Sequence, residues 1–165
     1  MSEQQIEANR LLVNRFYHEF WNEMDFEIAE EIVTPDLTFN GALGTQTKGI
    51  DGLTTYVKQL HDVFPDFRNS VEDMVAEEQK VAACLTYRGT HEGEIFGVEP
   101  AGQPVQYVGV GIFIFRADLI SHIWELGDRL SLLQQLNEPM HDDSILDMDS
   151  PPTGEDDPII PEWEE

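Results

Sequence analysis

The spacing of the apolar residues changes once along this chain, and the change divides it into two parts. Up to Phe64 the apolar side chains recur every three or four residues, which is the period of an amphipathic helix. Beyond Asp66 they alternate with a period of two, as in strands that bury one face. Helices followed by strands, rather than the two in alternation, predict an α+β domain in which a mostly antiparallel sheet curves around N-terminal helices.

Three helices are expected in the first part. The first spans residues 6–24. Asp25 can cap a second, shorter helix, which must end just before Pro35 because proline disfavours helical geometry in the residue that precedes it. A short strand over residues 37–40 and a third helix over residues 50–64 complete this part.

About four long strands are expected in the second part. The strand over 107–115 is apolar on both faces, so both faces need cover. Helices would cover one face, and we expect a second copy of the chain to cover the other. Gly109 and Gly111 within this strand predict strong curvature or a close approach by another group. A last strand over 119–125 leads into a short helix over 129–136.

The chain divides into one domain over residues 1–136 and a tail over residues 137–165. The tail holds eleven Asp and Glu, several Pro, and no Lys or Arg. It therefore lacks a core of its own, and we expect it to be poorly ordered or docked on the domain or a partner subunit. Cys84 cannot support a disulfide framework and is expected to be buried.

Charge and hydropathy exclude several partners. The net charge is −24 and no Lys or Arg residues are neighbours in sequence, so we expect no nucleic acid as a partner. No apolar run approaches the roughly 18 residues that a membrane span needs, and the N-terminus does not resemble a secretion signal. The sequence thus predicts a cytoplasmic protein without a membrane partner.

Glu125 is the main candidate for chemistry. Phosphate loops, cysteine pairs and histidine pairs at metal spacing are missing from the sequence, so we expect acid–base chemistry with no cofactor and no metal. Glu125 shares a strand face with Ser121 and Ile123, whereas Ile120, His122 and Trp124 are expected on the opposite face. Desolvation would raise the pKa of Glu125 toward neutrality if its face lines an apolar cavity. The alternative is that Glu125 pairs with Arg116 or Arg129, or simply meets water.

Two further residues are candidates for assisting Glu125. His91 and Asp128 could take part in catalysis. Asp128 also suits the N-cap of the helix that follows it, and His91 could be structural. Eight residues are expected to contact a ligand, with core packing as the alternative for the aromatic ones: Tyr17, Trp21, Asn40, Tyr56, Tyr107, Gly111, His122 and Trp124.

Four segments in order resemble the SnoaL-like polyketide cyclases, also called ester cyclases. They are the opening helix, the turn Phe64-Pro65-Asp66-Phe67, the pattern G-x-H-x-G-x-x-x-G-x-x-P-x-G over 89–102, and Ile123-Trp124-Glu125-Leu126-Gly127-Asp128 followed by Leu133-Gln134-Gln135-Leu136. The resemblance covers about residues 5–136. It implies the NTF2-like fold, a cone-shaped barrel in which a bent sheet wraps around helices over a deep apolar pocket.

The resemblance also implies a mechanism. In the family, one carboxylate on the last strand removes a proton beside a carbonyl group without metal or cofactor, and the resulting enolate closes a ring. That carboxylate falls on Glu125, where the antibiotic cyclases carry Asp, and the second family acid falls on Asp128. The cavity His of those cyclases falls on Gly111.

These observations predict a cofactor-independent cyclase or isomerase that acts on a small apolar carbonyl compound and forms a homodimer or higher homo-oligomer. A non-catalytic protein that binds an apolar small molecule is the alternative. A second alternative is an interaction module, like the nuclear-transport member of the superfamily. Whether Trp21, Tyr56 and Phe113 close the interior or merely line it helps to separate these possibilities.

Overall fold

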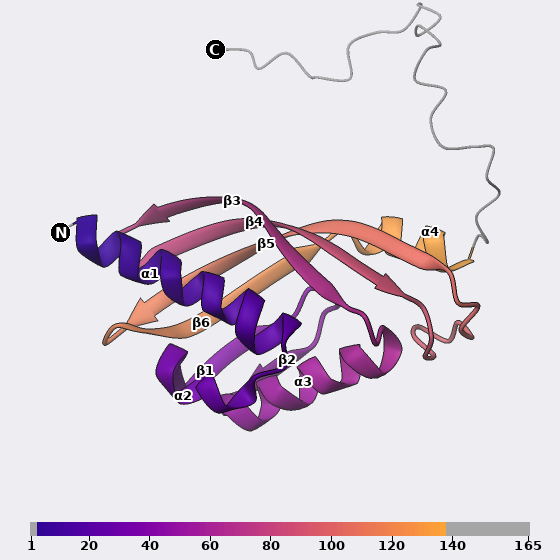
Figure 1. Ribbon diagram of the computed structural model, residues 1–165, viewed down its shortest axis with the longest axis horizontal. Coiled ribbons are helices and arrows are strands. Elements are labelled where there is room, and N and C mark those ends of the chain that lie inside the picture. The colour runs from indigo at the N-terminus through magenta and orange to yellow at the C-terminus, as the bar shows by residue number, and fades with distance from the viewer. Residues whose placement is uncertain (1–2, 138–165) are drawn as a thin grey trace, which may run out of the picture.

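The computed structural model describes residues 3–137, so the expected tail lies outside the described residues except for Asn137 (Figure 1). No helix among the described residues is long and apolar enough to cross a lipid bilayer. The elements in chain order are α1 (Glu3–Arg15), the π-helical segment η1 (Phe16–Asn22), the 3₁₀ turn η2 (Phe26–Ile28), α2 (Ala29–Ile32), β1 (Val33–Asn40), β2 (Gln46–Lys48), α3 (Gly49–Val63), β3 (Arg68–Glu77), β4 (Lys80–Thr90), β5 (Pro104–Arg116), β6 (Leu119–Gly127) and α4 (Arg129–Asn137).

The strands form one curved, mixed sheet in the order β2-β1-β6-β5-β4-β3. All neighbours are antiparallel except β1 and β6, which are parallel. The sheet is not closed, because β2 and β3 are its edges. Helices α1 and α3 lie within its curve, whereas α4 lies apart from them, beside the start of β5 (Figure 1). The predicted α+β fold with a mostly antiparallel sheet around N-terminal helices is confirmed.

The predicted helices differ from the observed ones in two places. The first continues to Asn22, but its last part is π-helical. The second is only a 3₁₀ turn and a single α-helical turn, and Asp25 makes no capping hydrogen bond with its side chain. The following strand begins at Val33, four residues earlier than expected. Extended backbone at Val33 and Thr34 agrees with the restriction that Pro35 imposes.

A bulge in β6 changes which residues reach the core. The pairing with β5 shifts between Ile114 and Phe115, so that Ser121 is left as the extra residue. Its hydroxyl donates to the carbonyl of Ile114 at 3.1 Å. Both Ile120 and Ile123 are therefore fully buried. The expectation that Ile120 lies on the face opposite Glu125 was wrong, because simple alternation does not hold across a bulge.

The two faces of the central strands have different surroundings. On β5, Phe113 and Phe115 are buried against the helices, whereas Val108, Val110 and Ile112 are exposed on the other face. Helices thus cover one apolar face, as expected, and no described residue covers the other. Cys84 is exposed, which corrects the prediction of a buried cysteine.

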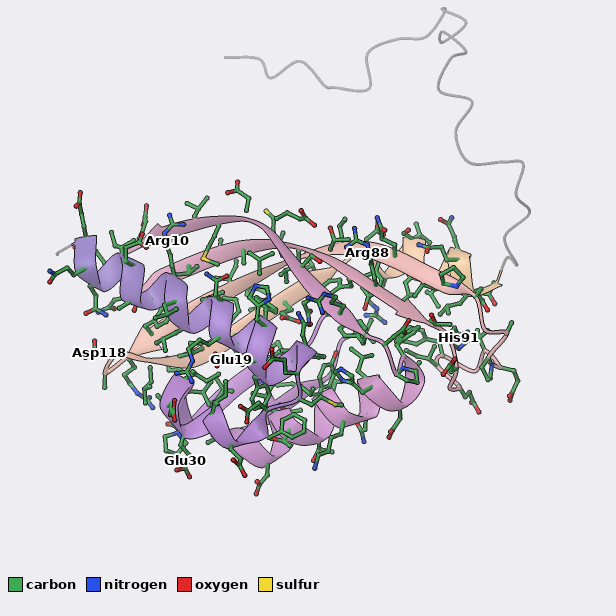
Figure 2. The ribbon with its side chains drawn as sticks, in the orientation of Figure 1. Arg10, Glu19, Glu30, Arg88, His91 and Asp118 are labelled. Atoms are coloured by element: carbon green, nitrogen blue, oxygen red, sulfur yellow. The ribbon has the colours of Figure 1, made fainter. Side chains whose placement is uncertain are left out.

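The Phe64-Pro65-Asp66-Phe67 turn after α3 is held against the end of β4 by hydrogen bonds. The carboxylate of Asp66 accepts hydrogen bonds from the backbone N–H and the hydroxyl of Thr90, at 2.6 and 2.7 Å. These bonds hold the pKa of Asp66 below its usual range. A Cβ at Gly89 would lie 2.8 Å from Cβ of Phe64, and one at Gly93 would lie 2.7 Å from the carbonyl oxygen of Asp62. The glycines therefore allow the segment around His91 to pack on the end of α3 (Figure 2).

Candidate active site

Glu125 is a buried carboxyl group on the inner face of β6. It pairs with Gly111 of β5, and only 5% of the residue is exposed. The hydroxyl of Tyr17 donates a hydrogen bond to its Oε1 at 2.9 Å. Neither arginine considered from the sequence is its partner. Arg116 pairs with Asp36, and the guanidinium of Arg129 lies over the ring of Phe96, 5.9 Å from its centroid.

Burial dominates the acidity of this group. Desolvation raises the pKa of Glu125 from 4.5 to about 7, and the hydrogen bond from Tyr17 partly opposes the rise because it favours the ionised form. A carboxyl group with this pKa exchanges its proton near neutral pH. That is the property a general acid–base group needs.

All four tyrosines of the chain surround Glu125. Tyr17 comes from η1, Tyr56 from α3, Tyr87 from β4 and Tyr107 from β5, and each is at most 8% exposed. Burial raises the pKa of every one of them, and the nearby charge of Glu125 raises it further. The four hydroxyls therefore stay protonated and can act as hydrogen-bond donors.

Three glycines make room for three of these hydroxyls. A Cβ at Gly111 would collide with the hydroxyl of Tyr17, and one at Gly109 would lie 2.8 Å from that of Tyr87. A Cβ at Gly41 would lie 2.5 Å from the hydroxyl of Tyr56. The predicted close approach at Gly109 and Gly111 is confirmed, and the approaching groups are tyrosines.

Tyr87 was not among the residues singled out from the sequence. Its ring lies 4.8 Å from that of Tyr107, centroid to centroid, and 6.0 Å from that of Phe67. It lies on the inward face of β4 together with Val81, Ala83 and Leu85, which are all buried and alternate with residues of the opposite face. This alternation was the available signal: a tyrosine on an apolar inner face brings a hydroxyl into the core.

His91 and Asp128 have other surroundings. His91 is fully buried at the end of α3, 6.0 Å from the ring of Phe64, and neither of its ring nitrogens makes a hydrogen bond in the described part of the chain. Asp128 is exposed, and its Oδ1 accepts a hydrogen bond from the backbone N–H of Ser131 at 3.0 Å. It is thus the N-cap of α4. Neither residue hydrogen-bonds to Glu125.

Three expected ligand contacts lie on the outer face of the sheet. Nδ2 of Asn40 and Nε2 of His122 are 3.0 Å apart across β1 and β6, and Trp124 is 61% exposed. A residue next to Glu125 on a strand points to the opposite face. Asn40 and Trp124 line a groove of about 290 Å³ between the β1–β2 turn and the end of β6, and Glu125 also lines this groove.

The remaining aromatic residues lie in the core, and one of them also lines a depression on the surface. Phe113 packs edge-on against Tyr17, with ring centroids 5.6 Å apart, and Trp21 packs against Tyr56 at 5.9 Å. Trp21 and Phe113 are 2% and 0% exposed, so they close the interior. Tyr56 also lines a surface depression of about 200 Å³, together with Leu43, Thr45, Gln59, Leu60, Val63, Ile95 and Phe96.

Within the described residues, no three His, Cys, Asp or Glu side chains gather in a way that could hold a metal ion. The site consists of one carboxyl group, four phenols and the apolar rings around them.

Comparisons with known proteins agree with this architecture. No curated protein matches the chain. Among solved structures, a provisionally assigned SnoaL-like polyketide cyclase from Jannaschia sp. CCS1 is 21% identical with a TM-score of 0.76, covering 85% of this chain and 99% of that one. IdmH from Streptomyces antibioticus, provisionally assigned as a polyketide cyclase, is 26% identical with a TM-score of 0.69, covering 79% and 99%.

A third structure, a SnoaL-like polyketide cyclase from Agrobacterium tumefaciens str. C58, is 21% identical with a TM-score of 0.65, covering 78% of this chain and 97% of that one. At these identities the Jannaschia and Agrobacterium structures establish the fold. The sequence profile of the SnoaL-like polyketide cyclases matches residues 11–136, which is most of the chain and nearly all of the described part. The protein belongs to the SnoaL-like polyketide cyclase family.

Proposed function

We propose that this protein is a cofactor-independent cyclase or isomerase in which Glu125 transfers a proton beside a carbonyl group of a small apolar ligand. Family membership supports a cyclase or isomerase role. The observation that carries the proposal is the state of Glu125. It is buried, has no cationic partner among the described residues, is held by Tyr17, and has a pKa of about 7.

The proposed reaction begins with the ionised carboxylate of Glu125. It takes a proton from the carbon next to a carbonyl group, and the C–H electron pair forms a C=C bond while the carbonyl π pair moves onto oxygen. In a cyclase the enolate carbon then attacks a second carbonyl carbon of the same molecule. The new alkoxide takes the proton back from Glu125. Atoms and charge balance without a further reactant.

Two effects would accelerate the proposed reaction. A proton shuttle fixed beside the reacting carbon typically contributes about 10²–10⁴-fold. A site beside Glu125 that holds the two carbonyl groups of the ligand together would add the advantage of proximity, since a bimolecular encounter is replaced by one within the bound molecule. The groove that Glu125 lines between the β1–β2 turn and the end of β6 is the route by which a ligand of this kind would reach the carboxyl group.

Exchange of carbon-bound hydrogen tests the proposal without knowledge of the natural substrate. An apolar ketone such as 2-tetralone is incubated with the protein in D₂O, and NMR follows loss of the signal from the protons next to the carbonyl. The wild type should accelerate exchange, whereas Glu125→Gln, which keeps the size of the side chain, should abolish the acceleration with the fold intact. Glu99→Gln, at an exposed position, serves as the matched control.

The alternative function makes the opposite prediction for the same experiment. A non-catalytic protein would bind the ketone without accelerating exchange in either form. Equal exchange by the wild type and Glu125→Gln would therefore remove Glu125 from any proton transfer and leave a binding role.

A further inference from the structure

We infer that Tyr87 is a second functional group of this site: its hydroxyl holds the carbonyl oxygen of the ligand and stabilises the negative charge that develops there. This inference rests on the acid–base role proposed for Glu125. It specifies which atom of the ligand lies where, and it adds a residue that acts on the carbonyl oxygen while Glu125 acts on the adjacent carbon.

The hydroxyl of Tyr87 is buried and makes no hydrogen bond within the described residues. Burial of an unpaired hydroxyl is unfavourable, so proteins rarely retain one without a reason. The hydroxyls of two neighbouring tyrosines do have hydrogen-bond partners. The hydroxyl of Tyr17 donates to Glu125, and the backbone of Leu43 hydrogen-bonds to that of Tyr56. Tyr87 is thus a buried donor for which residues 3–137 supply no acceptor.

The position of this hydroxyl follows from the sheet. The hydroxyl of Tyr87 lies over Gly109 of β5, and the hydroxyl of Tyr17 lies over Gly111 on the same face of that strand. The two glycines are about 7 Å apart, because each residue of a strand advances the chain by about 3.3 Å. Glu125 is the partner of Gly111 on β6. The free donor and the carboxyl group therefore face one stretch of the sheet, at a separation that a carbonyl group and its adjacent carbon would bridge with one hydrogen-bond-length contact at each end.

The electrostatics suit a donor to an oxyanion. Burial and the charge of Glu125 keep Tyr87 protonated, so its hydrogen is available for donation. A donor fixed in a desolvated site interacts more strongly with the negative charge of an enolate than with the neutral carbonyl group, which lowers the barrier to proton removal. The ligand class that fits is an enolisable carbonyl compound with apolar substituents.

Binding of 4-nitrophenol tests the inference, because its phenolate imitates a planar enolate and its ionisation is visible in the absorption spectrum. The test uses Glu125→Gln protein, in which no carboxylate repels the anion. This protein should bind 4-nitrophenolate, and adding Tyr87→Phe should weaken binding at least tenfold. Thr86→Val is the matched control: it deletes a hydroxyl from the next residue of β4, whose side chain lies on the opposite face.

Thermal unfolding separates a functional from a structural hydroxyl. Tyr87→Phe keeps the ring that packs on Phe67 and Tyr107 and removes only an unpaired polar atom, so its melting temperature should be unchanged or higher. A lower melting temperature with unchanged affinity for 4-nitrophenolate would assign the hydroxyl to structure and overturn the inference.

Two further outcomes are informative. Failure of Glu125→Gln protein to bind 4-nitrophenolate, or binding that Tyr87→Phe leaves unchanged, overturns the role of Tyr87 and leaves the hydrogen-exchange test of Glu125 untouched. Equal phenolate affinity of the wild type and Glu125→Gln above pH 7 would show that no carboxylate charge faces the ligand. In that case the proposed function fails, whatever Tyr87 does.

Discussion

At the scale of single residues, the chemistry of this site depends on what surrounds Glu125. The same carboxyl group at a solvated strand end would have an ordinary pKa. Here burial raises the pKa to about 7, and a single hydrogen bond from Tyr17 limits the rise. Gly111 is part of this arrangement because any side chain at that position would displace the Tyr17 hydroxyl.

Replacement of Tyr17 by Phe should raise the pKa of Glu125 above its wild-type value. The substitution removes the hydrogen bond that favours the ionised form, while the aromatic ring still excludes water. Infrared difference spectra of the carboxyl group between pH 5 and pH 9 report this pKa, and the Glu125→Gln spectrum identifies the band. Tyr56→Phe, which removes a hydroxyl not bonded to Glu125, is the control. A pKa equal to or below that of the wild type would contradict the role given to Tyr17.

The raised pKa of Glu125 also predicts how stability depends on pH. Between about pH 4.5 and pH 7 the folded protein binds a proton at Glu125 that the unfolded chain has released. The free energy of unfolding should therefore fall as pH rises through this window, by an amount on the order of 3 kcal/mol. Urea unfolding at several pH values measures the fall, and Glu125→Gln should lack this contribution. Parallel curves for the two proteins would show that burial does not perturb Glu125.

At the scale of elements, β6 and the start of α4 place acidic and aromatic groups in different surroundings within a few residues. Alternation sends Glu125 inward and Trp124 outward. The strand then ends, and Asp128 leaves the sheet to cap α4 through the backbone N–H of Ser131. Trp124 and Asp128 are thus close to Glu125 in sequence, but their side chains point away from its carboxyl group.

Substitutions at Asp128 should act on stability and not on chemistry. Asp128→Ala removes the cap and should cost about 1 kcal/mol of unfolding free energy, whereas Asp128→Asn caps a helix about equally well and should be close to neutral. Chemical denaturation measures both. The Asp128→Asn protein should still accelerate deuterium exchange of 2-tetralone. Loss of this acceleration in that stable variant would instead make Asp128 a second acid of the reaction.

At the scale of the whole molecule, the outer face of the sheet carries a contiguous apolar patch. Val110 pairs with Leu126 and Ile112 with Trp124 across β5 and β6, and all four side chains are between 39% and 73% exposed. Patches of this kind on soluble proteins commonly mark interaction surfaces. Because the patch continues over neighbouring strands of one sheet, we expect a second copy of the chain to cover it.

Light scattering after size exclusion should find a homodimer that Val110→Asp converts to a monomer. Val75→Asp, which is also exposed but lies on the edge strand β3, should leave the dimer intact. Each chain carries a net charge of −24, so the dimer should be weaker at low ionic strength, where repulsion between the copies is less screened. A wild type that is monomeric at high salt would contradict this assembly.

Several parts of the site could be predicted from the sequence, and others could not. Tyr17, Tyr56, Tyr107 and Gly111 were expected to contact a ligand. The structure places them around Glu125, because each lies on an inward-facing stripe that its own spacing reveals, and ligand contact stays a prediction. The prediction of the strand face on which Ile120 lies was wrong, because the extra residue of the bulge leaves no local signature in the side-chain pattern.

The sequence by itself determined the order of helices and strands, the family and the identity of the strand that carries the acid, because these follow from local periodicity and short motifs. The tertiary structure alone decided that Glu125 has no cationic partner in the described part of the chain and that four phenols surround it. Tyr17 and Glu125 are 108 residues apart, and the other three tyrosines come from three further elements. A pKa shift depends on solvent exclusion and on neighbours in space, so the shift at Glu125 arises only once the sheet has curved around its helices.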